Sequence, residues 1–209
     1  MKTDRPLYKV TCFITREKLG KKEILLLQHP TAGIQFPAGT VEIDENFTQA
    51  AILEAYEETG LKEFVTCKHI GHKNYFLPGK NVVLQKAAVF SRPNVSSNCW
   101  ASIRRGVIVK KERYYGDFTQ ISYIEGNKYP NPDYITYQIT GWMESCKLTS
   151  KIQRHFYHLH THSTLDNWEH EADKHVFKLF WSPINNLPPI VFPQNQWLEY
   201  VLTESGYLF

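Results

Sequence analysis

Three glutamates in this sequence, Glu54, Glu57 and Glu58, are spaced so that they could bind one ligand together. Spacing of i, i+3, i+4 puts side chains on one side of a helix. Like charges at that spacing repel each other, so the helix gains from them only when a cation is bound. Mg²⁺ and Mn²⁺ prefer such oxygen ligands. The pattern predicts a divalent-metal site, the alternative being an ordinary solvated acidic face.

The flanking residues predict the helix that carries these glutamates. Asn46 is a good N-cap, and Gln49 three residues later completes a pair that is similar to a capping box. Three alanines favour the helix and a glycine is placed to end it: Ala50, Ala51, Ala55 and Gly60.

A helical wheel of this segment predicts which way the carboxylates face. Apolar residues share their side: Phe47, Ala50 and Leu61. Other residues lie opposite: Gln49, Tyr56 and Thr59. Because the glutamates are interleaved with residues that pack a helix onto a core, we expect them to face inward, toward a walled site.

Residues 39–61, GTVEIDENFTQAAILEAYEETGL, resemble the signature of the Nudix hydrolases. That signature is Gly, five residues, Glu, seven residues, Arg-Glu, an aliphatic residue, any residue, Glu-Glu, any residue, Gly and an aliphatic residue. Its constrained positions are filled here by Gly39, Glu45, Glu54, Ala55, Glu57, Glu58, Gly60 and Leu61. The signature arginine is replaced by Leu53. Either the site relies wholly on metal, or another cation substitutes, or the activity is weakened.

The resemblance implies an α/β/α sandwich around a mixed sheet, and hydrolysis of a diphosphate linked to another group, usually a nucleoside. It implies that Glu54, Glu57 and Glu58 bind Mg²⁺ or Mn²⁺, with the Gly39 carbonyl as a further ligand. Glu42 and Glu45 match acidic positions of the family's loop. The group that activates water differs among members. Glu57 and Glu58 are candidates, together with a carboxylate on a later loop, for which Glu171 is the first choice and Glu169 the second.

The chemistry of a diphosphate fits a site of this kind. Its clustered negative charge repels a nucleophile, and metal ions neutralise that charge, orient the phosphoryl group and acidify bound water. Positioning and electrostatics then do most of the catalysis.

Length and composition limit the remaining function classes. The chain has 209 residues, enough for one domain or a domain with a small insert, and 42% of them are hydrophobic. A net charge of +3 does not favour nucleic-acid binding. No signal-peptide or membrane-spanning run is seen, and four scattered cysteines are typical of cytoplasmic thiols. We therefore expect a cytoplasmic protein with a nucleotide-like small-molecule partner and no membrane association. Whether it forms a homodimer stays open.

Strand-like segments flank the helix, near residues 8–15, 23–28, 64–70, 82–90, 154–161 and 175–181, and a last helix is predicted at 194–203. Between residues 91 and 150 the residue composition changes: a linker-like stretch is followed by short strand-like segments. We expect a hydrolase domain of residues 1–90 and 151–209. Residues 91–150 resemble an inserted Src-homology-3-like β-barrel, the alternative being extra hairpins of one fold.

Alternating histidines, His158, His160 and His162, share one strand face and are interpreted as a polar face rather than a metal site. Three functions stay open from sequence: a Mg²⁺-dependent pyrophosphohydrolase, a catalytically weak nucleotide-binding sensor, and an RNA 5′-end pyrophosphohydrolase. The full set of carboxylates favours the first.

Overall fold

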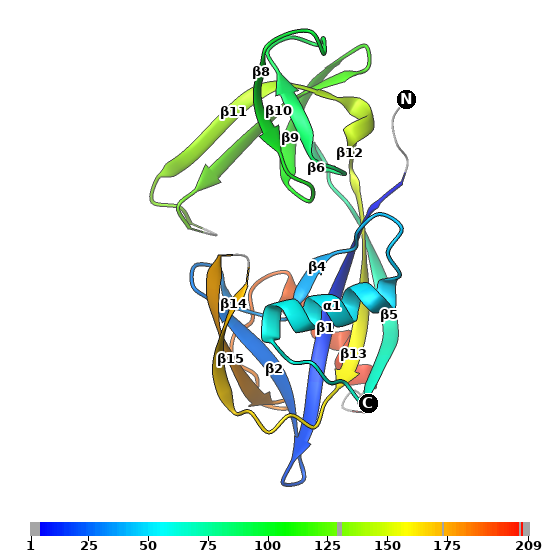
Figure 1. Cartoon of the computed structure of the whole chain (residues 1–209), viewed down its shortest axis with the longest axis vertical. Coiled ribbons are helices and arrows are strands. Elements are labelled where there is room, and N and C mark those ends of the chain that lie inside the picture. Colours follow the sequence, from blue (N-terminus) through cyan, green and yellow to red (C-terminus); the bar gives the residue numbers. More distant parts are fainter. Residues whose placement is uncertain (1–4, 129–130, 173, 205, 207–209) are drawn as a thin grey trace. The chain divides into compact units, whose positions relative to one another are not determined.

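A computed structural model describes residues 5–128, 131–172, 174–204 and 206 of the chain. The chain divides into two compact units (Figure 1). We call Lys9–Lys73 with Arg154–Phe209 the α/β unit, and Met1–Tyr8 with Asn74–Gln153 the β unit. Among the described residues, no helix is long and apolar enough to cross a membrane.

The α/β unit is built on an eight-stranded sheet. Its main path runs β14-β15-β2-β1-β13-β5, with β3 beside β2 and β4 beside β1. The strands are β1 (Leu7–Lys18), β2 (Lys21–His29), β3 (Gly33–Gln35), β4 (Ala38–Thr40), β5 (Thr66–Phe76), β13 (Lys151–His160), β14 (Asn167–Ala172) and β15 (His175–Pro183).

The sheet is mixed. Arg154 Nη1 donates to the Val10 carbonyl (3.0 Å), and the Thr161 N–H donates to the Thr15 carbonyl (3.0 Å). These contacts advance in the same direction along β1 and β13, so the two neighbouring strands are parallel. The pairs β1–β2 and β2–β15 are antiparallel. The α/β fold with a mixed sheet that the sequence predicts is confirmed.

Helices cover both faces of this sheet, which explains why β1 is buried without interruption from Val10 to Arg16. Helix α1 (Phe47–Thr59) lies on one face, where the Cys12 thiol reaches it. The short helix η2 (Gln194–Trp197) and helix α2 (Leu198–Glu204) cover the other, where Phe13 and Phe156 pack in one apolar cluster with Trp197 (Figure 1). The predicted last helix is thus confirmed as a 3-10 turn that continues into an α-helix.

The β unit is a seven-stranded antiparallel sheet in the order β12-β6-β9-β10-β11-β7-β8. Its elements are β6 (Lys80–Val83), β7 (Ala87–Phe90), β8 (Cys99–Ile103), β9 (Ile108–Tyr115), β10 (Phe118–Gly126), β11 (Ile135–Glu144), η1 (Ser145–Lys147) and β12 (Leu148–Thr149). Its core is a separate apolar cluster that includes Val83, Val89, Ile121 and Met143. A Src-homology-3-like barrel stays a prediction.

The unit boundary in the structure lies at Asn74 and Gln153, outside the 91–150 boundary that we expected. Residues 82–90 form two strands rather than one, and both pair within the β unit. The linker-like residues 92–98 connect β7 to β8, and the Ser91 N–H donates to the Asn98 carbonyl (2.9 Å). The expectation of a linker was wrong because Pro, Asn and Ser favour hairpin turns and linkers alike.

Excision of the β unit tests this boundary. We expect the α/β unit to fold when residues 75–152 are replaced by a short Gly/Ser linker, because β5 and β13 are neighbours where the chain leaves and returns. There Gln153 Nε2 donates to Asn74 Oδ1 (2.8 Å). Circular dichroism and a cooperative thermal transition are the measurements.

The matched control replaces only residues 95–149, which removes most of the β sheet but leaves β6 and β7. The buried side chains of Val83 and Val89 would then be exposed, so we expect an insoluble chain. A folded 95–149 variant beside an unfolded 75–152 variant would contradict the boundary.

Candidate active site

Helix α1 begins and ends as the sequence predicts. Asn46 Oδ1 accepts from the N–H groups of Thr48 (2.9 Å) and Gln49 (3.3 Å), which is an N-cap. Gly60 ends the helix in the left-handed conformation (φ 74°), and its N–H donates to the Tyr56 carbonyl (2.7 Å). The local sequence therefore fixes the length of the helix.

Small residues let α1 lie close to the sheet. Ala51, Ala55 and Thr59 form a fully buried stripe, four residues apart, and the Cys12 thiol on β1 donates to the Ala51 carbonyl (3.1 Å). The expectation that Thr59 lies on the outer side was wrong. Its hydroxyl donates to the Ala55 carbonyl, so the helix itself satisfies this buried polar group.

Glu54 lies directly against the backbone of β4. A Cβ atom added to Gly39 would meet the Glu54 carboxylate at 1.6–2.1 Å. Atoms this close would overlap, so the carboxylate, which ends a flexible side chain, would have to move away from β4. Gly39 and Glu54, two positions of the signature, are therefore in direct contact.

Glu58 is held on the same strand by a hydrogen bond. The Ala38 N–H donates to Glu58 Oε2 (2.8 Å), and a backbone donor to a carboxylate is a charge-assisted bond. Burial, together with the nearby Cys67, Glu54 and Glu58, raises the pKa of the Cys12 thiol well above its usual value. Both carboxylates are half-buried and lie between α1 and β4.

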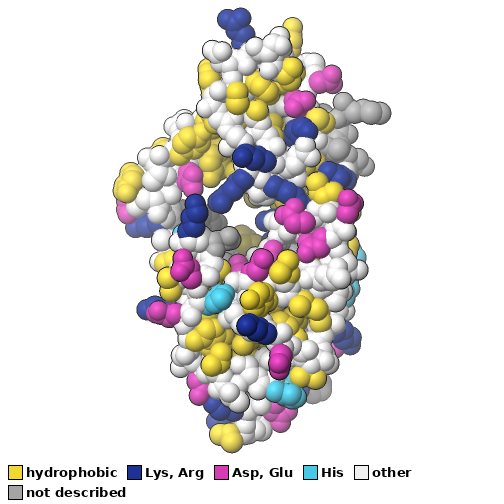
Figure 2. Space-filling model, in the orientation of Figure 1, with side chains coloured by type: hydrophobic (Ala, Val, Ile, Leu, Met, Phe, Trp, Pro, Cys, Tyr) yellow, Lys and Arg dark blue, Asp and Glu magenta, His cyan; other side chains and the backbone are white. Residues whose placement is uncertain are grey.

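Glu57 faces solvent, in contrast to the expectation that all three glutamates face inward. A helix turns by about 100° per residue, so Glu57 points farther from the buried alanine stripe than Glu54 and Glu58 do. Across the described ranges, no three His, Cys, Asp or Glu side chains are close enough to hold a metal ion. Acidic side chains are visible on the face that carries α1 (Figure 2).

The sequence matches the family model of the NUDIX domain over residues 6–95. Solved structures that are similar to it include the NUDIX domain of Shewanella oneidensis NrtR complexed with ADP ribose. That match has 11% identity and a TM-score of 0.48, and covers 97% of this chain and 90% of that one. The match to the C. elegans Ap4A hydrolase has 13% identity and a TM-score of 0.42. It covers 98% of this chain and 100% of that one. No curated protein matches the sequence.

Residues 6–95 of the chain form a NUDIX domain. Because both TM-scores are low, this assignment rests on the family match and on the signature in residues 39–61. The protein is accordingly placed among hydrolases that act on phosphoanhydride bonds.

The Nudix loop before α1 is closed by one of its own acidic residues. The Glu42 N–H donates to Glu45 Oε2 (2.8 Å), and the Glu45 N–H donates to the Glu42 carbonyl (3.3 Å). Glu45 is therefore a loop-closing residue in this structure, whereas Glu42 is exposed.

Glu171 and Glu169 do not lie on a loop, as we expected, but in strand β14. Trp168 and His170 on this strand face the end of α1. Trp168 Nε1 donates to the Thr59 carbonyl (2.7 Å), and His170 Nε2 donates to the Glu57 carbonyl (3.0 Å). Successive residues of a strand point to opposite faces, so Glu169 and Glu171 point away from α1, and both are exposed. Asp173, two residues after Glu171, lies outside the described residues.

Sequence reasoning singled out this segment for its carboxylates and missed the role of Trp168 and His170. The two side chains satisfy carbonyl groups that the end of a helix leaves without partners. The alternation of ring and acidic residues over 168–171 was the available signal, since it is typical of a strand.

Leu53, which replaces the family's arginine, is 45% exposed. It therefore contributes little to the core, and packing does not require leucine at this position. Arg154 lies on the α2 side of the sheet. It donates to Thr11 Oγ1 (2.7 Å) and its guanidinium carbon lies 4.4 Å from the centre of the Trp197 ring. These contacts give it a structural role.

Histidines gather where α1 begins. The His155 ring stacks on Phe47 (4.2 Å between ring centres), and its Nδ1 lies 3.1 Å from His69 Nε2. The His72 ring also stacks on His155, with 5.6 Å between the ring centres. Burial, followed by the charges of His69 and His72, lowers the pKa of His155 to about 4. The alternating His158 and His160 both contact Thr15 Oγ1 on the opposite face of the sheet, in keeping with a polar strand face.

Gly39→Ala tests the contact with Glu54. We expect a loss of about 1 kcal/mol in unfolding free energy, because the added methyl group forces the half-buried Glu54 carboxylate to move aside. Urea unfolding measures it. In a Glu54→Ala background the same change should cost little, since the clashing atoms are gone. Equal losses in both backgrounds would contradict the proposed steric cause.

His155→Phe tests the histidine cluster. Above the ordinary His pKa of 6.5, His155 is neutral in both the folded and unfolded chain and adds no pH dependence. As the pH falls from 6.5 to about 4, the unfolded chain takes up this proton first, so stability is lost over that range. We expect His155→Phe to flatten that loss in urea unfolding at pH 7, 6, 5 and 4, while the exposed control His162→Phe does not. Identical slopes in all three proteins would contradict the assignment.

Proposed function

We propose that this Nudix protein uses Mg²⁺ or Mn²⁺ to hydrolyse the diphosphate link of a nucleoside diphosphate-linked or nucleoside triphosphate substrate. The observation that supports the proposal is the placement of Glu54 and Glu58 between α1 and β4. Gly39 makes room for one carboxylate and the Ala38 N–H orients the other.

The residues at this place fit a divalent cation by their chemistry. Glu54 and Glu58 supply carboxylate oxygens, which Mg²⁺ prefers. We propose Glu57 on the next turn and the Gly39 carbonyl as further ligands.

When bound, the metal neutralises the charge of the diphosphate and acidifies water. The residues of the chain supply position. The Ala38 N–H fixes Glu58, and the packed alanine stripe fixes the distance between α1 and the sheet. Glu57 and Glu58 are our candidates to take the proton from the attacking water. A role for Glu171 stays a prediction, and its position on the outer face of β14 does not favour it.

Glu58→Gln and Glu57→Gln test the proposal. We expect each to lower kcat by about a hundredfold or more, because weaker charge on the cation costs several kcal/mol of transition-state stabilisation. The fold should survive Glu58→Gln, since the amide oxygen of the introduced glutamine can still accept from the Ala38 N–H. Both variants also leave less like-charge repulsion on the helix. Phosphate release is measured with Mg²⁺, Mn²⁺ or EDTA, with ADP-ribose and Ap4A among the first substrates.

Glu199→Gln is the matched control, because Glu199 is an exposed glutamate on α2, on the other face of the sheet. It should keep wild-type rates, and Glu171→Gln in the same series decides whether β14 contributes a carboxylate. Wild-type rates for both Glu57→Gln and Glu58→Gln on a true substrate would show that the metal assignment is wrong.

A further inference from the structure

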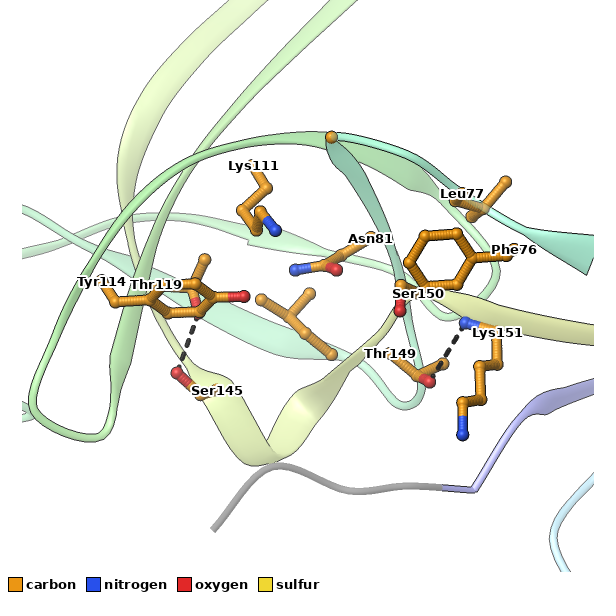
Figure 3. A pocket seen from close by; sticks show the side chains of 12 residues that line it. Phe76, Leu77, Asn81, Lys111, Tyr114, Thr119, Ser145, Thr149, Ser150 and Lys151 are labelled. Carbon is orange, nitrogen blue, oxygen red and sulfur yellow. Dashed lines mark hydrogen bonds between the residues drawn. The ribbon is translucent and has the colours of Figure 1, made fainter.

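The β unit contains a cavity of about 280 Å³, and its lining residues all belong to that unit (Figure 3). Strands β6, β9, β10 and β12 contribute to it, together with the η1 turn, the last residue of β5 (Phe76) and the first residue of β13 (Lys151). One ordered water takes up about 30 Å³, so the space holds several waters or a small organic ligand. It is close to the lower end of the range of typical ligand pockets.

The polar groups of the lining are hydroxyl, amide and ammonium groups, and none of the lining residues is Asp or Glu. The most buried of them are Asn81, Thr119, Ser145 and Thr149, each less than a tenth exposed. A wall that combines hydrogen-bond donors with positive charge and carries no carboxylate favours an anion over a cation or a neutral apolar molecule.

Asn81 is the most informative of these residues. Its side chain is 6% exposed, and its amide points into the cavity between Phe76 and Tyr114 (Figure 3). Among the described residues no hydrogen-bond partner of this amide is found. The amide atoms of Asn81 are accessible from the cavity, so they are available to form hydrogen bonds with a molecule bound there.

Lys111 supplies positive charge. It is half-buried on β9, with its ammonium nitrogen 5.4 Å from the centre of the Tyr114 ring and on the cavity side (Figure 3). Its neighbour Lys110 points to the opposite face of the strand, where it is exposed and forms an ion pair with Glu112 (3.1 Å). The two adjacent lysines thus have different environments: Lys111 lines the cavity, as Lys151 also does, whereas Lys110 does not.

A pair of buried hydroxyls completes the polar wall. Thr119 Oγ1 and Ser145 Oγ lie 2.8 Å apart, and either can be the donor. One O–H is used within the pair, which leaves the second hydrogen to bond elsewhere. Phe76 and Tyr114, whose aromatic side chains are exposed, also line the cavity.

We propose that this cavity is a binding site for a phosphate monoester. The phosphate is held by Lys111, the Asn81 amide and the Thr119–Ser145 hydroxyl pair, and the organic group lies against Tyr114 and Phe76. The site is formed within the β unit, and the inference does not depend on the activity proposed for α1.

Calorimetric titration of the full-length protein in EDTA tests the site. The probes are inorganic phosphate, adenosine 5′-monophosphate and adenosine. We expect saturable binding of the first two at one site and none of adenosine. Tighter binding of the nucleotide than of phosphate would identify the rings as part of the site, and equal binding would identify free phosphate as the ligand.

Two lysine variants with the same loss of charge separate specific binding from general attraction. Lys111→Met should weaken phosphate and nucleotide binding at least about tenfold, the effect of losing one charge-assisted hydrogen bond. Lys110→Met should leave the affinity unchanged. Asn81→Asp, which is nearly isosteric, should abolish binding by placing a negative charge in the cavity, and its fold is checked by circular dichroism. If that variant does not fold, the lysine pair decides alone.

Three results would overturn the inference. These are the absence of saturable binding of either anion, an equal loss of affinity in Lys110→Met and Lys111→Met, and binding of adenosine as tight as that of its monophosphate.

Discussion

The close approach of α1 to the sheet is the constraint on which the candidate active site depends. Ala51 and Ala55 have side chains small enough for the helix backbone to reach the Cys12 thiol, and Gly39 has no side chain to keep Glu54 away from β4. Larger residues at positions 51 and 55 would push the helix outward, and a side chain at position 39 would displace the Glu54 carboxylate. The carboxylates would then lose their contacts with the strand, although the helix itself could still form.

The end of α1 adds an electrostatic constraint. A helix carries partial negative charge at its C-terminus, and its last turn here contains Glu57 and Glu58 but no basic residue. Trp168 and His170 donate hydrogen bonds to carbonyl groups of this turn and so offset part of the unfavourable charge. A bound cation would offset the rest, which agrees with the proposed use of a divalent metal.

The candidate sites of the two units offer opposite chemistry. The α1 face of the α/β unit offers carboxylate oxygens and suits a cation. The cavity of the β unit offers ammonium, amide and hydroxyl donors without a carboxylate, and suits an anion. Each unit has its own apolar cluster, so each can hold its polar groups in place without help from the other's core.

The sequence by itself determined the local features of this protein: the cap at Asn46, the stop at Gly60, the signature of residues 39–61 and most of the strands. Such features depend on neighbours within a few residues, so local patterns encode them. Only the tertiary structure decided that Glu57 faces solvent, that Glu171 lies on the outer face of a strand, and that the β unit begins at Asn74. It alone brought Asn81 and Lys111 to one cavity. These outcomes depend on which strand pairs with which and on how a helix is rotated against its sheet, and contacts between distant residues fix both.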